Sequence, residues 1–575
     1  RADDFTEEIE PMQALHSVQP SLAFTNHRAV APARVETPAQ NGDTFQPADD
    51  QQPPAPPPPP ANISHYYYSQ DSLAEQLKTD QFSAEGVEAG PSNARIRVSD
   101  SDHETAAPDE QGNMLYLPND PRFNQVQTFV AVNRANSYFS EMLGREPEWA
   151  FGSPQLTINP FGGDMLNAYY SRSDGSLNFF QHTDPRMNKT VDSGLSAEVV
   201  YHEAGHALLD AVRPGWISSY RGATGGIHEG FGDMLSVLVG LRDERNLDKV
   251  IAETGGDLWK DNSVSRLAEE LGRAIWDETG TERPNHDYLR NARNHLINAD
   301  PSTLPWRPPA EDQLGAEPHN YSRVASGAVY DVLASLNQQF QAQGFGVRES
   351  IEKARDITAK LEIKGFEFCP PGSLPSYGHF AAGMLAVDAS EFGGKYHDTV
   401  ANMMAARNII PPAPEPPPQG IALPENVNAA SAQALLEDKR EALGVPAGLN
   451  LAVDKIKTND EGQTFVTYTY TKDIDVAEAS GVENAVVKEQ GGLTLAFDAD
   501  GKLFFKTLNE IKPQDEAEIR ESVKKNVEEG AIHTHSIFNS LPGASKLFKN
   551  QHVPFRGYMA NENGQVVLKK SPIID

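Results

Sequence analysis

The chain has 575 residues, with 81 Asp and Glu against 49 Lys and Arg, which gives a formal net charge of −32 at pH 7. This length suffices for roughly two to four domains with cores of their own, and the acidic surface would repel phosphate backbones, so no nucleic-acid partner is expected. No apolar run approaches the ~18 residues that a membrane span needs. The single cysteine, Cys369, is expected to be a buried thiol.

Residues 1–108 lack apolar periodicity and are rich in Ala, Gln, Pro, Asp and Ser. The proline run at 56–60 is typical of an extended, semi-rigid segment. Such a run can bind an SH3-like domain or act as a spacer, and composition favours the spacer. We therefore expect a flexible N-terminal arm over residues 1–108, in which the stretches 66–68 and 96–98 can pack on the next domain.

From about residue 110 the apolar residues become periodic. The spacing predicts a helix over 123–143, which Gly144 ends, and strands at 156–158 and 177–180 that flank the stretch 167–170. Strands that come first and helices that come later predict an α+β domain with a cleft between two lobes. The later helices are predicted over 263–277, 321–340, 348–361 and 379–408, the last interrupted at Gly393 and Gly394.

Residues 199–209 contain the pattern H-E-x-x-H within an apolar run. On a helix, His202 and His206 lie one turn apart on the same face, so both imidazoles can bind one metal ion. Glu203 can take a proton from water without being a ligand. The structural alternative is a core helix with two hydrogen-bonded histidines, because the pattern arises by chance in about 3% of chains of this composition.

A second apolar helix is predicted over 226–239, and it places Glu229 and Asp233 on one face. One of these carboxylates can complete a zinc site made of two histidines and one acid, with a fourth position left for water. The other can accept the outer N–H of a ligating histidine and fix its tautomer. Two helices with complementary halves of one site favour a metal over the structural alternative.

This pair of helices resembles the thermolysin-like zinc metalloendopeptidases of the gluzincin class, in which the third zinc ligand is a glutamate on the next helix. The resemblance covers about residues 110–410. It implies one zinc ion bound by His202, His206 and Glu229, with Glu203 as general base and acid and Asp233 orienting His202. Glu229 follows His206 by 23 residues, slightly more than in close relatives.

Further positions match the family. Asn167 and Ala168 resemble the edge strand that binds the substrate backbone, and Arg290 resembles the arginine that holds the substrate carbonyl. The resemblance also implies that His319 is the second catalytic histidine, and that Tyr220, nine residues before Glu229, is the tyrosine on the oxyanion side.

Two features of the family are altered in this chain. The acid that supports the second histidine is replaced by Leu314, and Glu317 or Asp312 can substitute for it. The calcium ligands are poorly matched, because Gly240 falls where an acid is expected, although Glu198 fits another position. Calcium is therefore possible but is not supported by matching ligands.

A second proline-rich stretch at 411–419 predicts a linker and a domain boundary. Residues 420–575 are expected to form a small α+β accessory domain. Its predicted elements are a helix at 430–443, strands at 464–470 and 493–497, a hairpin that turns at 498–502, a helix at 517–529 and a strand at 566–568.

We thus expect a thermolysin-like catalytic domain over 109–410, with a mixed strand and helix N-lobe and a helical C-lobe, followed by the accessory domain. The expected function is zinc-dependent endopeptidase, a monomer that acts on polypeptide substrates. The resemblance implies a secreted protein, although no signal peptide is visible. The alternatives are a gluzincin aminopeptidase, which a pocket for a free amine would indicate, and a surface binding protein that has lost turnover, which the intact Glu203 argues against.

Overall fold

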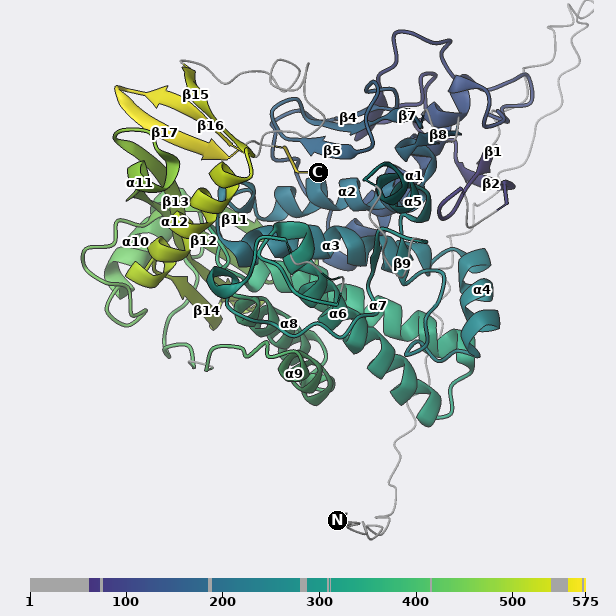
Figure 1. Ribbon diagram of the computed structural model, residues 1–575. Helices are drawn as coiled ribbons and strands as arrows, with labels where there is room; N and C mark the ends of the chain where they lie inside the picture. Colours follow the sequence, from purple (N-terminus) through teal and green to yellow (C-terminus); the bar gives the residue numbers. More distant parts are fainter. Residues whose placement is uncertain are drawn as a thin grey trace, which may run out of the picture. The chain divides into compact units, whose positions relative to one another are not determined.

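The computed structural model describes residues 62–72, 76–184, 189–279, 287–307, 310, 312–413, 416–538, 557–570 and 573–574 (Figure 1). Helices and sheets are both extensive in these residues, so the fold is of the α+β class. Among the described helices, none combines the length and the apolar character that a bilayer span requires. The proline run at 56–60 lies outside the described residues.

A five-stranded sheet has the order β18-β5-β6-β4-β3; four of its strands come before the helix α2 (Ala197–Val212) in the chain, and β18 comes after all the described helices. The strand β5 pairs antiparallel with β6 and with β18, whereas β3, β4 and β6 run parallel. Leu156, Ile158, Tyr170, Leu177 and Phe179 are buried in this sheet. The strands are β3 (Ile96–Val98), β4 (Leu156–Asn159), β5 (Ala168–Ser171), β6 (Ser176–Phe179) and β18 (Ile573–Ile574).

The described part of the expected flexible arm, residues 62–108, is folded onto the core. The strands β1 (Asn62–Tyr67) and β2 (Lys78–Ser83) form an antiparallel pair, and β3 joins the five-stranded sheet. Ile63, His65 and Tyr67 alternate along β1 with their side chains buried, and the Tyr67 hydroxyl lies 2.7 Å from that of Tyr201. This alternation spans only a few residues, so the polar and proline-rich composition around it hides it in the sequence.

Long helices form the central part of the structure, and the first of them ends where the sequence predicts. The helix α1 (Pro121–Leu143) starts at an Asp120 cap and ends at Gly144, which is in the left-handed conformation. The helices α2 (Ala197–Val212) and α3 (Gly222–Gly240) pack against each other, and α3 packs on α6 (Pro318–Ala342). The other helices are α4 (Glu244–Thr254), α5 (Glu269–Thr279), α7 (Val347–Phe368), α8 (Tyr377–Glu391) and α9 (His397–Ala406).

Two helix predictions differ in detail from the structure. The stretch 379–408 forms two helices, α8 and α9, as the glycine interruption indicates. The helix predicted over 263–277 begins only at Glu269, because Ala268 adopts a positive φ of 54° and the short strand β9 (Arg266–Leu267) precedes it. That strand pairs with β10 (Arg290–Asn291), and this pairing fixes the backbone at Arg290.

The residues after 420 form a seven-stranded sheet in the order β11-β12-β13-β17-β16-β15, with β14 on β13. Hydrophobic clusters separate from the main core lie on this sheet, with Leu436, Tyr468 and Leu495 in one and Ile519 and Met559 in another. The strands are β11 (Ala452–Thr458), β12 (Thr464–Asp475), β13 (Ala485–Phe497), β14 (Leu503–Asn509), β15 (Ile532–Phe538), β16 (Gly557–Glu562) and β17 (Gln565–Lys570). The helices of this region are α10 (Ala429–Lys439), α11 (Ala477–Ser480) and α12 (Pro513–Glu528). Earlier in the chain, before α2, β7 (Gln181–Asp184) and β8 (Lys189–Asp192) form a small antiparallel pair.

This C-terminal region (residues 420–570) contacts the segment that leads into α3. The Ser219 hydroxyl donates to Glu489 Oε1 at 2.6 Å, the Gly222 N–H donates to Glu518 Oε1 at 2.9 Å, and Arg221 pairs with Asp515. Residues 59–575 accordingly form one compact unit. The start of α3 is therefore held by carboxylates of the C-terminal region, where the helix N-terminus favours negative charge.

This contact predicts a pH-dependent effect of the substitution Glu518→Gln. Burial raises the pKa of Glu518 from 4.5 to about 7, although Arg221 opposes the shift. Between these two values the folded chain binds a proton that the unfolded chain does not, so the free energy of unfolding falls as the pH rises through this window. Glutamine stays neutral and still accepts from Gly222. We expect E518Q to raise the thermal midpoint at pH 8 and to change it little at pH 5.

The matched control is Glu528→Gln, at an exposed position of the same helix. It should leave the midpoint unchanged at both pH values. Scanning calorimetry of the two variants gives the comparison, and an equal change for E518Q at pH 5 and pH 8 would contradict the assignment.

Candidate metal centre

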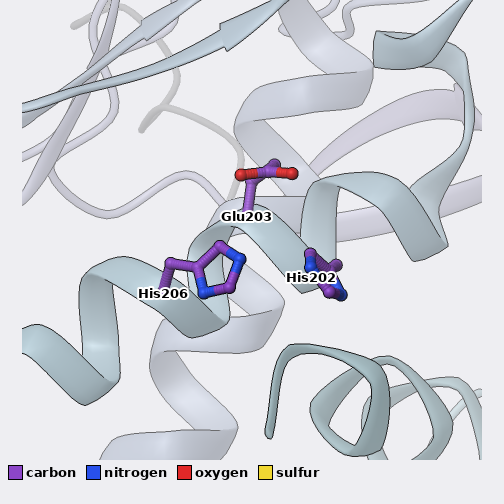
Figure 2. Close-up of side chains that lie close together, drawn as sticks. All are labelled: His202, Glu203 and His206. Atoms are coloured by element: carbon purple, nitrogen blue, oxygen red, sulfur yellow. The ribbon is translucent and has the colours of Figure 1, made fainter. Parts of the chain in front are cut away.

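The helix α2 places three polar side chains in the protein interior. Ser196 caps the helix, and every residue from Ala197 to Val212 is buried. Figure 2 shows the imidazoles of His202 and His206 on the same side of this helix, with Glu203 beside them. The exposed fractions of His202, Glu203 and His206 are 7%, 3% and 0%. Potential ligand atoms of the three residues lie within 4.8 Å of one another.

A carboxylate of α3, Glu229, lies close to both imidazoles. Glu229 Oε2 lies 3.3 Å from His202 Nε2 and 3.8 Å from His206 Nε2. These separations exceed the ~2.7–3.2 Å of a good N–H···O hydrogen bond. They are close to the ~3.3–3.5 Å that separates neighbouring ligands in a tetrahedron with bonds of about 2.0–2.2 Å. The three atoms thus surround a space of the size that zinc occupies.

Among the described residues, neither ring nitrogen of His206 has a hydrogen-bond partner, and the same is true of Glu229 Oε2. A buried polar atom without a partner costs about 1–3 kcal/mol. The electrostatics also suit a cation, because burial and the neighbouring His202 and His319 lower the pKa of His206 well below 6.5, which keeps this imidazole neutral. Burial raises the pKa of Glu229, but His319 and His202 outweigh it and keep the carboxylate ionised.

Asp233 and Arg290 determine which nitrogen of His202 faces the space. His202 Nδ1 lies 3.0 Å from Asp233 Oδ1, and Arg290 holds the same carboxylate through Nη2 at 2.8 Å and Nε at 2.9 Å. Burial raises the pKa of Asp233, but Arg290 and His202 lower it to about 2. An ionised Asp233 accepts a hydrogen bond from the N–H at Nδ1, which leaves Nε2 available to bind a metal.

Without a metal, His202 binds an extra proton. Burial lowers its pKa, but the neighbouring carboxylates of Asp233 and Glu229 raise it to about 9. A metal at Nε2 must displace this proton, so affinity for the metal decreases as the pH falls.

His319 lies at the exposed side of the same group. Its Nε2 atom is 3.3 Å from Glu229 Oε2, and its side chain is 25% exposed. Glu317, the cap residue of α6, contacts His319 Nδ1 through Oε1 at 2.8 Å and accepts from the Asn320 N–H through Oε2 at 3.1 Å. Of the two acids considered as supports for His319, Glu317 therefore takes this position.

The other expected site residues are distributed differently. Ala168 is the first residue of β5, which packs on α2, and Asn167 directly precedes the strand. Arg290 reaches the group through Asp233. Tyr220 is buried in the hydrophobic cluster of the C-terminal region, where its hydroxyl points at Gly557. The described contacts that join the histidines and Glu229 do not include Tyr220, because its side chain points away before α3 begins.

Three residues that the motif does not single out also lie beside the histidines: Gly205, Gly232 and His228. A Cβ on Gly232 would lie 2.7–2.9 Å from the His202 ring, and a Cβ on Gly205 would lie 3.1 Å from Gly232 Cα, so these glycines allow α2 and α3 to approach closely. His228 is buried with its ring centroid 5.7 Å from that of His206. The glycine-rich sequence around Glu229 was the available signal for this close packing.

Glu198, the one matched calcium position, makes protein hydrogen bonds. It accepts from Gln70 at 3.2 Å and from the Ala268 N–H at 2.9 Å. Burial, together with Glu269 and Asp71, raises its pKa well above 4.5. Within the described residues, the side chains found close enough together to hold a metal ion are those of His202, Glu203 and His206 on α2.

In comparisons with known proteins, no family model matches the chain and no curated protein sequence shows significant similarity to it.

The substitution Gly232→Ala is expected to weaken metal binding. The added methyl group would displace the His202 ring, because less than 3 Å separates it from three ring atoms. A shift of a ligand by a few tenths of an ångström exceeds the tolerance of a zinc bond. Titration with zinc in the presence of a competing chelator should give a dissociation constant at least about 10-fold higher.

Gly240→Ala is the matched control, since a Cβ there would meet only Val264 Cγ1 at an ordinary 3.8 Å. It should bind zinc as the unsubstituted chain does. Equal zinc affinity of G232A and G240A would show that His202 is not a ligand.

Proposed function

We propose that this protein is a zinc-dependent endopeptidase. The observation that supports it is the spacing of His202 Nε2, His206 Nε2 and Glu229 Oε2 around one buried point, with Glu203 beside them. Two imidazoles and one carboxylate form a donor set typical of catalytic zinc, in which a fourth position stays open. A zinc ion bound there supplies Lewis acidity to a substrate carbonyl and lowers the pKa of water.

Glu203 provides the proton transfer. It follows His202 directly, and its carboxylate lies within 4.8 Å of potential ligand atoms of His202 and His206. In the proposal Glu229 is the third ligand, and Glu203 is the residue that exchanges a proton. It is 3% exposed, so it can act on a water molecule that is shielded from bulk solvent. In the proposed reaction it accepts a proton from the attacking water and delivers it to the leaving amine.

His319 acts from the opposite, more exposed side. Its ring is oriented by Glu317 at Nδ1, so that Nε2 is the atom directed at the reaction space. As an imidazolium, with a proton on each ring nitrogen, it donates a hydrogen bond from Nε2 to the oxygen on which negative charge develops. Because Tyr220 lies in the C-terminal cluster, we assign this role to His319 alone.

The strand β5 supports the choice of a peptide as substrate. This strand packs on α2, and the resemblance implies that Asn167 and Ala168 bind the substrate backbone. An extended backbone that binds along an edge strand is held on both sides of the cut bond, which favours cleavage inside chains. The proposal includes the thermolysin-like, two-lobed catalytic domain, a monomeric state and secretion, all of which follow from the sequence resemblance.

The substitution Glu203→Gln tests the mechanism. We expect zinc to stay bound, because Glu203 is not among the proposed ligands, while casein hydrolysis falls by about 10²–10⁴-fold. Zinc content is measured by atomic absorption and hydrolysis by release of labelled peptides. Glu244→Gln, at an exposed position in α4, serves as the control and should retain full activity.

If E203Q and the unsubstituted chain cleave casein at the same rate, the proposed mechanism is wrong. If both bind zinc and neither cleaves any peptide, the binding-protein alternative is supported instead.

The substitution His319→Gln distinguishes two roles for this side chain, a hydrogen-bond donor to the substrate and a zinc ligand. As a donor, His319 contributes about 10²–10³-fold to kcat, so H319Q should keep one zinc per chain and lose turnover of this size. The exposed His295 gives the control, H295Q, which should behave as the unsubstituted chain. Loss of zinc from H319Q would instead assign the imidazole to the metal.

A further inference from the structure

We infer that the strand β18 (Ile573–Ile574) inhibits the proposed peptidase by pairing with β5, the strand that is to bind the substrate backbone. This inference rests on the proposed function, because it names what occupies the substrate edge of the same site. In Figure 1 the short yellow strand β18 lies next to β5.

The pairing has a defined register. Ile573 pairs with Ser171 and Ile574 with Tyr170, in antiparallel orientation. Among the described strands, β18 is the outermost of its sheet, so β5 would be the edge strand without it. The register places the pairing at the C-terminal end of β5, and a chain that continued beyond Ile574 in the same direction would run toward Ala168 and Asn167.

β5 is firmly attached to the metal helix at this end. The Tyr170 hydroxyl donates to Asp210 Oδ2 at 2.8 Å, and Arg172 Nε donates to the same oxygen at 2.7 Å. Asp210 lies one helical turn after His206 on α2. A segment that pairs with Tyr170 and Ser171 therefore lies along the helix that carries the ligands, on the path that a peptide substrate would take.

The C-terminal region holds β18 in place from the other side. β17 ends at Lys570, and only Ser571 and Pro572 separate it in the sequence from Ile573. Lys570 Nζ donates to the Ser219 carbonyl at 2.9 Å, and Tyr220 packs against Gly557. Both contacts fix the end of β17 at the approach to α3, so the short connection presents β18 to β5 at a high effective concentration.

A ladder of two residue pairs is short, so a substrate that pairs along the whole of β5 can displace it. Effective concentrations of tethered segments are typically about millimolar. A short peptide substrate must compete with β18 at this concentration, and the competition raises KM without changing kcat. Removing β18 should therefore lower KM for short peptides by about 10-fold.

The test is the full chain with Ile573→Pro and Ile574→Pro together. Proline has no backbone N–H and cannot donate to a β-ladder. The double valine variant, Ile573→Val and Ile574→Val, keeps the backbone donors and serves as control. Two quantities are measured for each chain: hydrogen exchange of the amides in residues 168–171, and KM and kcat for a short fluorogenic peptide.

We expect the proline variant to exchange faster in β5 but not in β4, and to show the lower KM with an unchanged kcat. The valine variant should match the unsubstituted chain in both respects. Unchanged exchange in β5 would overturn the pairing, whatever the activity. Faster exchange with unchanged KM, in a chain that cleaves peptides, would overturn the inhibition. If no chain cleaves peptides with zinc bound, the proposed function fails and the inhibition with it, while the exchange result still decides the pairing.

Discussion

Glu229 Oε2 lies within 3.8 Å of the Nε2 atoms of His202, His206 and His319, in an interior almost closed to water. Among the described residues, Glu229 Oε2 and His206 Nε2 have no hydrogen-bond partner. A divalent cation held by His202, His206 and Glu229 would satisfy both atoms, because each ligand would donate one lone pair to it. The position of Glu229 depends in turn on the packing of α2 against α3, which the small residues Gly205 and Gly232 permit.

The surrounding structure orients two of the imidazoles. Asp233, held by Arg290, orients His202, and Glu317 at the cap of α6 orients His319. Arg290 in turn lies in the short pairing of β9 with β10, which connects distant parts of the chain. The geometry of the centre therefore depends on four separate elements, and none of them alone could orient the imidazoles.

Local patterns in the sequence were sufficient to predict the helices α2 and α3. The i, i+4 spacing of His202 with His206 and of Glu229 with Asp233, together with apolar periodicity, predicts α2 and α3 and the faces that meet. Gly144 likewise predicts the end of α1. The resemblance also pointed to His319, which the structure brings to Glu229.

Contacts between distant segments could not be predicted in the same way. The burial of β1 depends on a partner, Tyr201, more than 130 residues away, and the sequence around β1 shows no such partner. Tyr220 packs against Gly557 in the hydrophobic cluster of the C-terminal region. Its sequence spacing from Glu229 gave no indication of this packing. The pairing of β18 with β5 joins residues about 400 apart, and only the folded chain reveals it.

X-ray absorption at the zinc edge, on the full chain loaded with one equivalent of zinc, tests the central claim most directly. The account predicts two imidazole nitrogens and one carboxylate oxygen at about 2.0–2.2 Å, with a lighter fourth ligand from solvent. The loss of an imidazole contribution in His202→Ala and in His206→Ala, but not in His295→Ala, would complete the assignment. A coordination shell without imidazole, or zinc that is not retained at one equivalent, would contradict it.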